Sequence, residues 1–96
     1  MLMLVSYDVA TTTPAGAKRL RKIAETCLDF GIRVQHSVFE CNVDPAQWEV
    51  LRHELLSLYN KEEDSLRFYC LGSNWHRRLE HYGKDVVSDI DAPMIL

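Results

Sequence analysis

One stretch constrains the fold more than any other: the first nine residues, MLMLVSYDV. They begin with five apolar residues and carry no charge before Asp8. Because alternate side chains of a strand point to opposite faces of a sheet, the run predicts a central strand that is buried on both sides. Asp8 then lies where the strand ends, and a carboxylate at that point stays hydrated and charged. Asp8 is therefore the first candidate for chemistry.

Composition excludes several classes of protein. A chain of 96 residues, of which 47% are hydrophobic and 26% charged, is typical of one small globular domain. Three widely spaced cysteines and four histidines without an H-x-x-x-H pair argue against a disulfide framework and a zinc site, so we expect reduced, buried thiols. The longest apolar run is too short to span a membrane and no basic segment precedes it, so we expect a cytoplasmic protein without a membrane partner.

Two helices are predicted from their start signals and apolar stripes. Residues 14–30 follow a capping threonine and begin with proline, and Gly31 would end this helix in a left-handed conformation. Residues 45–59 follow a capping aspartate and also begin with proline. Apolar residues recur three and four positions apart: Ala17, Leu20, Ile23, Ala24, Cys27 and Leu28 in the first helix, and Trp48, Leu51, Leu55 and Leu58 in the second.

The remaining segments predict further strands. Residues 32–43 are rich in β-branched and aromatic types, which predicts one long strand, bent or split by a bulge near Ser37. A solvated acidic loop at 61–64 then leads to a strand over 66–71 that a glycine closes. Residues 76–82 are more polar and fit an edge strand.

These elements predict an α+β fold, a ferredoxin-like βαββαβ sandwich with both helices on one sheet face. We expect residues 1–84 to form this domain, and residues 85–96 to add a C-terminal strand that contacts a partner subunit. The other sheet face would be open although the first strand is apolar on both sides, which predicts a homodimer through that face. On its two-fold axis, Asp8 would meet its own copy.

Asp8 allows two interpretations. It is a turn carboxylate that accepts hydrogen bonds from backbone amides before the first helix, or it is a metal ligand. Two carboxylates that meet across an axis repel each other, and one Mg²⁺ per dimer, shared by both copies of Asp8, would relieve that repulsion. The cation would also acidify a water molecule for phosphodiester hydrolysis.

A basic cluster is present although the net charge of the chain is −3. Four positive charges fall within five residues of the first helix: Lys18, Arg19, Arg21 and Lys22. The cluster is a solvated helix face or, doubled by a two-fold axis, a track that binds nucleic-acid phosphates. Arg77 and Arg78 could add to such a track.

Two aromatic residues and a serine complete the candidates. Tyr7 is a core residue or a phosphate-binding hydroxyl, and the core is favoured. Phe39 is core filler or a platform on which a base stacks, and here too the core is favoured. Ser37 suits an ordinary strand position.

Five motifs along the chain carry a family resemblance. They are Tyr7-Asp8-Val9 after the apolar strand, residues 12–16 before the basic helix, Arg33-x-Gln35-x-Ser37-Val38-Phe39-Glu40, Arg67-Phe68-Tyr69, and Leu79-Glu80-His81-Tyr82-Gly83. Together they cover nearly the whole chain and resemble the CRISPR-associated protein 2 family, the small partner of the integrase in spacer acquisition.

The resemblance implies a ferredoxin-like homodimer whose paired Asp8 residues bind Mg²⁺ for endonuclease cleavage of RNA or DNA. It implies that residues 85–96 help to dock the CRISPR integrase, and that duplex DNA and single-stranded RNA are the candidate nucleic acids. Some members of this family are non-catalytic scaffolds, and toxin-type ribonucleases look similar, so both alternatives stay open. The resemblance links Arg19 and Arg21 to duplex binding, and it links six residues to nuclease activity: Tyr7, Asp8, Arg19, Arg33, Ser37 and Phe39.

Overall fold

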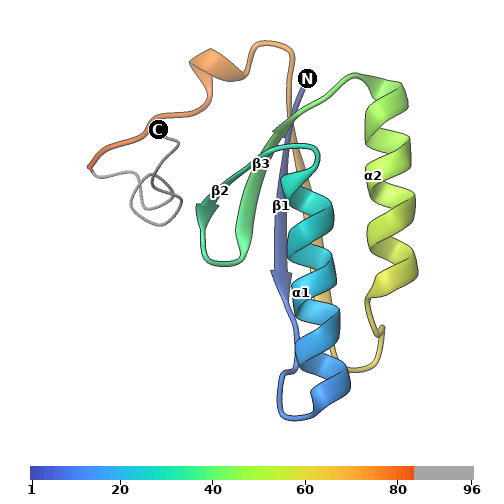
Figure 1. The fold of residues 1–96 in the computed structure, drawn as a ribbon. Coiled ribbons are helices and arrows are strands. Elements are labelled where there is room, and N and C mark those ends of the chain that lie inside the picture. The colour runs from blue at the N-terminus through green and yellow to red at the C-terminus, as the bar shows by residue number, and fades with distance from the viewer. Residues whose placement is uncertain (84–96) are drawn as a thin grey trace.

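A computed structural model describes residues 1–83 as two helices on one face of a four-stranded antiparallel sheet (Figure 1). The elements are β1 (Leu2–Asp8), α1 (Pro14–Leu28), β2 (Ile32–Gln35), β3 (Val38–Asn42), α2 (Pro45–Leu58), β4 (Ser65–Gly72) and a 3₁₀ turn, η1 (Trp75–Arg77). The strand order β2-β3-β1-β4 places β1 inside the sheet. The predicted α+β, ferredoxin-like fold with a central first strand is therefore confirmed.

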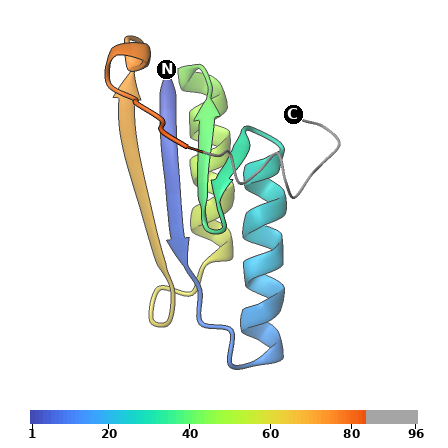
Figure 2. The ribbon, with the colours of Figure 1, turned by 90° about the vertical axis from the view of Figure 1, so that its left-hand side faces the viewer.

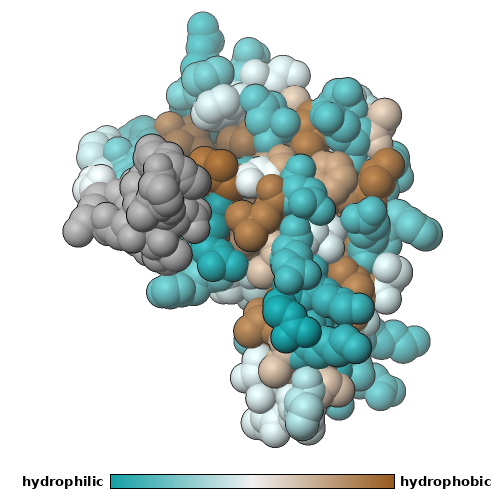
Figure 3. Space-filling view, viewed as in Figure 1, coloured by the Kyte–Doolittle hydropathy of each residue, from teal (hydrophilic) through white to brown (hydrophobic). Residues whose placement is uncertain are grey.

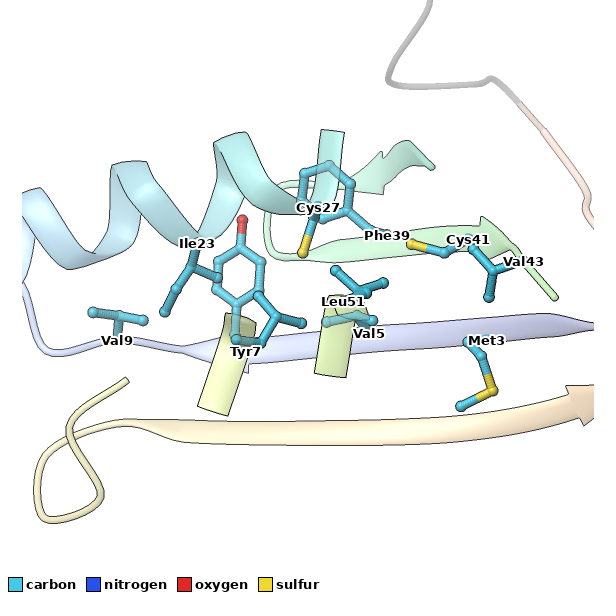
Figure 4. Close-up of a cluster of buried hydrophobic side chains, with 11 residues drawn as sticks. Met3, Val5, Tyr7, Val9, Ile23, Cys27, Phe39, Cys41, Val43 and Leu51 are labelled. Carbon is cyan, nitrogen blue, oxygen red and sulfur yellow. The ribbon is translucent and has the colours of Figure 1, made fainter. Parts of the chain in front are cut away.

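Alternation along β1 sorts its side chains onto two faces of the sheet. The strand pairs on both edges, with β3 and with β4. Met3, Val5 and Tyr7 point toward the helices and join the buried core (Figure 4). The opposite face carries the residues between and after them: Leu4, Ser6 and Asp8.

Both helices start where the capping signals predict. The Thr13 hydroxyl oxygen accepts a hydrogen bond from the Gly16 backbone N–H at 3.1 Å. The Asp44 carboxylate accepts one from the Gln47 backbone N–H at 2.7 Å, and the Gln47 side-chain oxygen accepts one from the Asp44 backbone N–H at 3.0 Å. These bonds satisfy donors that the first helical turn leaves unpaired, which fixes each start next to its proline.

The core lies between the two helices and the sheet. Ile23 and Cys27 of α1 and Leu51 and Leu55 of α2 are fully buried, as their apolar stripes predict. They pack against the helix-facing side chains of β1 and β3 (Figure 4). Burying a leucine or isoleucine side chain contributes about 1.5–3 kcal/mol to stability.

The outer surfaces of the helices are mostly hydrophilic. Figure 3 shows hydrophobic side chains scattered among polar ones in the view of Figure 1, and Leu28, Val50 and Leu56 are exposed on the helices. Within residues 1–83 no helix is both long and apolar enough to cross a membrane.

The second face of the sheet has no helix on it. Figure 2 shows the described part of the segment after η1 crossing in front of β1 on this side. Leu4, Tyr69 and Leu79 are among the residues that line a shallow groove of about 420 Å³ there. The predicted open face is thus present in the described residues, and the homodimer through it stays a prediction.

Two predicted strands differ from the structure. Residues 32–43 are a hairpin, β2 and β3, joined by a tight turn at His36 and Ser37 rather than one strand with a bulge. The edge strand predicted at 76–82 is wrong, because η1 occupies its start and no strand follows up to residue 83. In that turn the Trp75 carbonyl accepts the backbone N–H groups of Arg78 and Leu79, so the chain curls back instead of extending.

Two further expectations are corrected by local packing. The left-handed glycines of residues 1–83 are Gly72 and Gly83, not Gly31. Gly31 is instead required by space, since a Cβ there would collide with the Glu40 carbonyl oxygen and the Cys41 side chain. The helix before it ends at residue 28, two residues earlier than predicted.

The cysteines separate into two kinds. Cys27 and Cys41 are buried, and burial raises their pKa to about 12 and about 11, so both stay protonated thiols. Cys70 on β4 is exposed, contrary to the expectation that all three are buried. The predicted strand at 85–96 and the domain boundary at residue 84 lie outside the described residues.

The difference in burial between two adjacent leucines of α2 predicts that they contribute unequally to the free energy of unfolding. Leu55→Ala should lower the free energy of unfolding by about 2–5 kcal/mol, because it leaves a cavity beneath α2. Leu56→Ala is the matched control, since Leu56 is 38% exposed and Leu55 is 0% exposed, and it should cost less than about 1 kcal/mol. Urea unfolding measures both, and equal losses would contradict this helix orientation.

Candidate functional site

Asp8 ends β1 on the open face of the sheet. It lies opposite Ser65 of β4, and its side chain is exposed. The carboxylate borders a small, mostly polar hollow of about 310 Å³. The lining residues come from the ends of β1 and β4: Ser6, Tyr7, Asp8, Ser65, Arg67 and Tyr69.

One subunit supplies a single carboxylate to this hollow. Within residues 1–83, no group of three histidine, cysteine or acidic residues could hold a metal ion, and neither ion pair involves Asp8. Mg²⁺ keeps most of its waters and needs only one or two carboxylates. The oxygen donors present therefore fit a hydrated Mg²⁺ and do not fit a closed, zinc-like site.

Tyr7 and Phe39 lie on the helix-covered side of the sheet, away from Asp8. Phe39 is 0% exposed and Tyr7 is 4% exposed, and their rings are 6.1 Å apart. The Tyr7 hydroxyl points toward α1 in Figure 4 and donates a long hydrogen bond of 3.4 Å to the His36 carbonyl. The favoured core interpretation of both aromatic rings is borne out by this burial, and a base could stack on Phe39 only if the core opened.

Arg33, which is half-buried, extends this aromatic pair. Its guanidinium carbon lies 5.2 Å from the centre of the Phe39 ring, a cation–π contact. Its Nε is buried and has no hydrogen-bond partner in the described structure. Burial raises the pKa of the Tyr7 hydroxyl, and the Arg33 charge opposes that rise. Tyr7 is therefore neutral at physiological pH and cannot act there as a base.

Ser37 lies in the tight turn between β2 and β3. Its backbone carbonyl accepts a hydrogen bond from the Tyr7 backbone N–H at 3.1 Å, which fixes the turn against the end of β1. Of the six residues linked to cleavage, the structure thus places Asp8 on the open face and Tyr7, Arg33 and Phe39 on the other. Their roles in cleavage stay predictions.

Arg19 is held in an ion pair. Its Nε donates to the Asp64 carboxylate at 2.8 Å, and its Nη2 reaches Glu63 at 3.3 Å. The Arg19 side chain is 19% exposed and the Asp64 side chain is 0% exposed. The charge of Arg19, one of the four in the basic cluster, is therefore paired within the fold.

Asp64 is the residue that sequence reasoning missed. Besides Arg19, its carboxylate accepts the backbone N–H of Ala10 at 3.1 Å and that of Asn60 at 2.8 Å. It thereby joins the loop after β1 to the loop before β4, although the acidic loop was expected to be solvated. The Arg19 hydrogen bond and the two amides hold the pKa of the Asp64 carboxyl below its ordinary value of 3.8. The neighbouring Asn60, whose side chain accepts the Glu62 N–H, was the available signal for a structured turn.

The remaining basic residues fall into separate groups. Lys18, Arg21 and Lys22 are exposed and take part in neither ion pair of the described structure. Arg21 is about 200° around the helix from Arg19 and borders a different hollow, beside Tyr7 and His36.

Arg77 and Arg78 follow β4 at the opposite end of the sheet from the start of α1 (Figure 1). Arg78 donates to the Leu71 carbonyl at 3.0 Å. One subunit therefore does not bring these two arginines next to the basic helix.

The sequence and the fold both match known proteins. Residues 1–79 match the family described as CRISPR associated protein Cas2. The chain is 59% identical over 96 residues to the CRISPR-associated endoribonuclease Cas2 of Chlorobaculum tepidum, with 100% of both chains covered. It is 50% identical over 95 residues to the CRISPR-associated endonuclease Cas2 of Halalkalibacterium halodurans, with 99% of each covered. The crystal structure of Streptococcus pyogenes Cas2 at pH 6.5 has a TM-score of 0.74 and 54% identity, covering 86% of this chain and 100% of that one.

The lowered pKa of the Asp64 carboxyl predicts that the stability of the fold depends on pH. Because its folded-state pKa is lowered, the ionised carboxylate stabilises the fold above its ordinary value, and that contribution is lost as the pH falls through the folded pKa. Asp64→Asn should cost about 1–3 kcal/mol at pH 7, the effect of breaking hydrogen bonds of a buried charged group. Urea unfolding should show this difference shrinking below about pH 4.

The control for this experiment lies in the same loop. Glu62→Gln removes an exposed carboxylate and should leave the stability within about 0.5 kcal/mol of the wild type at every pH. A deficit of Asp64→Asn that is the same at pH 3 and pH 7 would mean that its charge contributes nothing.

Proposed function

The chain belongs to the CRISPR-associated protein Cas2 family, as its motifs predict, and from this premise we propose that it is a CRISPR-associated nuclease of spacer acquisition. In this proposal a homodimer hydrolyses phosphodiester bonds at Asp8 with Mg²⁺, and it binds duplex DNA together with the CRISPR integrase. The observation that carries it is the position of Asp8, an exposed carboxylate in a polar hollow at the end of a buried strand.

The chemistry of the hollow supports hydrolysis at Asp8. A carboxylate without an ion pair is available to hold a hydrated Mg²⁺. When bound there, Mg²⁺ would supply positive charge against the phosphate and a more acidic water. Ser6 and Ser65 add to the same hollow two hydroxyl groups, which are able to hydrogen-bond water or phosphate oxygens.

The open sheet face supports self-association. Its groove contains apolar side chains from all four strands: Leu4, Val34, Val38 and Leu71. A second copy on this face would cover these side chains and bring a second Asp8 to the axis. The dimer would thereby provide the second carboxylate that one subunit lacks.

The exposed basic residues of α1 support duplex binding. Lys18, Arg21 and Lys22 carry three charges that no ion pair of the described structure neutralises. Their contacts to phosphates would be independent of base sequence and sensitive to salt. Binding beside the integrase follows from the family resemblance alone.

A non-catalytic scaffold is the second candidate. The single carboxylate per subunit and the absence of a three-ligand group within residues 1–83 favour it. Spacer capture that persists in an Asp8→Asn strain would identify the scaffold. A free-standing toxin-type endoribonuclease is the third candidate, and a gene neighbourhood with CRISPR repeats and an integrase would exclude it.

The nuclease proposal predicts a loss of cleavage in Asp8→Asn. Cleavage in Mg²⁺ should fall by roughly a hundredfold or more, the scale on which removing a transition-state charge stabiliser acts. Parallel assays with duplex DNA and single-stranded RNA, titrated with Mg²⁺, would identify the substrate and the metal dependence together.

Asp29→Asn is the matched control for Asp8→Asn. It removes an exposed carboxylate at the end of α1, outside the hollow, and should cleave as the wild type does. Full activity in purified Asp8→Asn would refute hydrolysis at Asp8 and point to a contaminating nuclease.

The proposed duplex binding predicts a loss of DNA affinity that is independent of cleavage at Asp8. Replacing Lys18, Arg21 and Lys22 with glutamine should weaken binding to all duplex sequences alike. Each phosphate contact removed should lower the slope of log affinity against log salt by about 0.9. Arg19 is kept unchanged, since its replacement would also leave Asp64 unpaired.

Arg52→Gln, on the exposed side of α2, is the control that removes one positive charge away from α1 and should change the salt slope little. Fluorescence anisotropy across a salt series measures both variants. A triple variant with unchanged affinity and slope would show that α1 is an ordinary solvated face.

A further inference from the structure

Arg67 shares the hollow with Asp8, although its position in the sequence does not suggest it. The register pairs Ser6 with Arg67 and Asp8 with Ser65. Arg67 is therefore diagonal to Asp8 across two neighbouring strands and on the same sheet face, with their Cα atoms about 7–8 Å apart. An arginine side chain spans such a distance easily.

The charge of Arg67 is not paired with an acidic residue in the described part of the chain. Neither ion pair of residues 1–83 includes it. Its single side-chain hydrogen bond within residues 1–83 is a long one, 3.5 Å from Nη1 to the Tyr69 hydroxyl. That contact raises the pKa of Arg67, so the guanidinium stays charged. Most of its N–H donors remain available to a ligand.

The other arginines with assigned contacts are engaged elsewhere. Arg19 forms an ion pair with Asp64, and Arg33 makes a cation–π contact with Phe39. Arg78 donates a hydrogen bond to a backbone carbonyl at the far end of β4. Arg67 differs from all three because it borders the same hollow as the candidate catalytic carboxylate.

The negative charge of Asp8 repels a phosphodiester. A positively charged side chain in the hollow would therefore help to bind the substrate, in addition to the exchangeable Mg²⁺. A guanidinium donates two parallel hydrogen bonds to phosphate oxygens, and it acts without a metal. The basic residues of α1 do not line this hollow and cannot replace it.

We propose that Arg67 is a catalytic residue of the Asp8 site, binding the non-bridging oxygens of the phosphodiester group that is cleaved, while the Tyr69 hydroxyl steadies its guanidinium. This inference rests on the proposed function and adds to it the residue that holds the substrate. It assigns phosphate binding in the hollow to Arg67 and hydrolysis to Asp8.

The direct test observes Arg67 itself by NMR. A thymidine dinucleotide with one phosphodiester is titrated, without Mg²⁺, into full-length protein labelled with ¹⁵N. The side-chain Nε–H signal of Arg67, assigned by its absence in Arg67→Gln, should shift with saturation. Signals of Arg52, an exposed arginine on α2, should not move.

Kinetics and metal binding provide the second readout. Arg67→Gln should lower kcat/KM for cleavage by roughly 10- to 100-fold, the effect of losing a charge-assisted hydrogen bond to phosphate. Arg67→Lys should recover part of the loss, because lysine keeps the positive charge but cannot donate the two parallel hydrogen bonds of a guanidinium. The Mg²⁺ affinity, measured by calorimetry without nucleic acid, should stay at the wild-type value.

The outcomes separate this inference from the proposed function. A wild type that cleaves nothing but shifts the Arg67 signal would overturn the nuclease and keep the phosphate site. No shift, or unchanged cleavage in Arg67→Gln, would overturn the role of Arg67 and leave the nuclease intact. An Arg67→Gln variant that dissociates in sedimentation experiments or loses Mg²⁺ affinity would also overturn it, since Arg67 would then be a dimer or metal-site residue.

Discussion

Side chains of β1 alternate between a face that two helices cover and a face that they leave open, and this alternation organises the molecule. Val5 and Tyr7 anchor the core on one side. Asp8, at the next position, emerges on the other side, where β4 contributes Arg67 and Tyr69. A shift of one residue in the register of β1 would exchange the two sets, burying the carboxylate and exposing the core. The placement of Asp8 and Arg67 on one face therefore depends on the same pairing that builds the sheet.

This alternation also divides the residues that the resemblance links to cleavage. Tyr7 and Phe39 form a buried stack on the helix side, with the half-buried Arg33 over the Phe39 ring. The Tyr7 backbone is hydrogen-bonded to the turn at Ser37, so replacing these residues can also alter the position of β1 and of Asp8. Arg19 acts on the fold by a different route, through Asp64 and the two loops that it joins. Loss of activity after replacement of these residues would not by itself show contact with substrate.

Much of the fold could be predicted because its signals are local. A cap with a following proline, and apolar residues at helical spacing, gave both helix starts and the buried Ile23 and Leu51. The position of Asp8 followed from the apolar run before it. The missed features depend on contacts between distant segments. The turn at His36 and Ser37 contains no glycine or proline, and the space requirement at Gly31 comes from β3. The burial of Asp64 depends on an arginine 45 positions away. Arg67 joins Asp8 only through the strand register, which composition and spacing do not reveal.

The contrast between the cysteines has a practical consequence. Cys27 and Cys41 are enclosed in the core, whereas Cys70 lies exposed on β4, next to Tyr69 in sequence. A maleimide dye or spin label should therefore attach to the native chain at one position, without engineered substitutions. In an assembly with two-fold symmetry the two attached probes would form a pair, and the distance between them would report how the sheets of the two subunits are arranged.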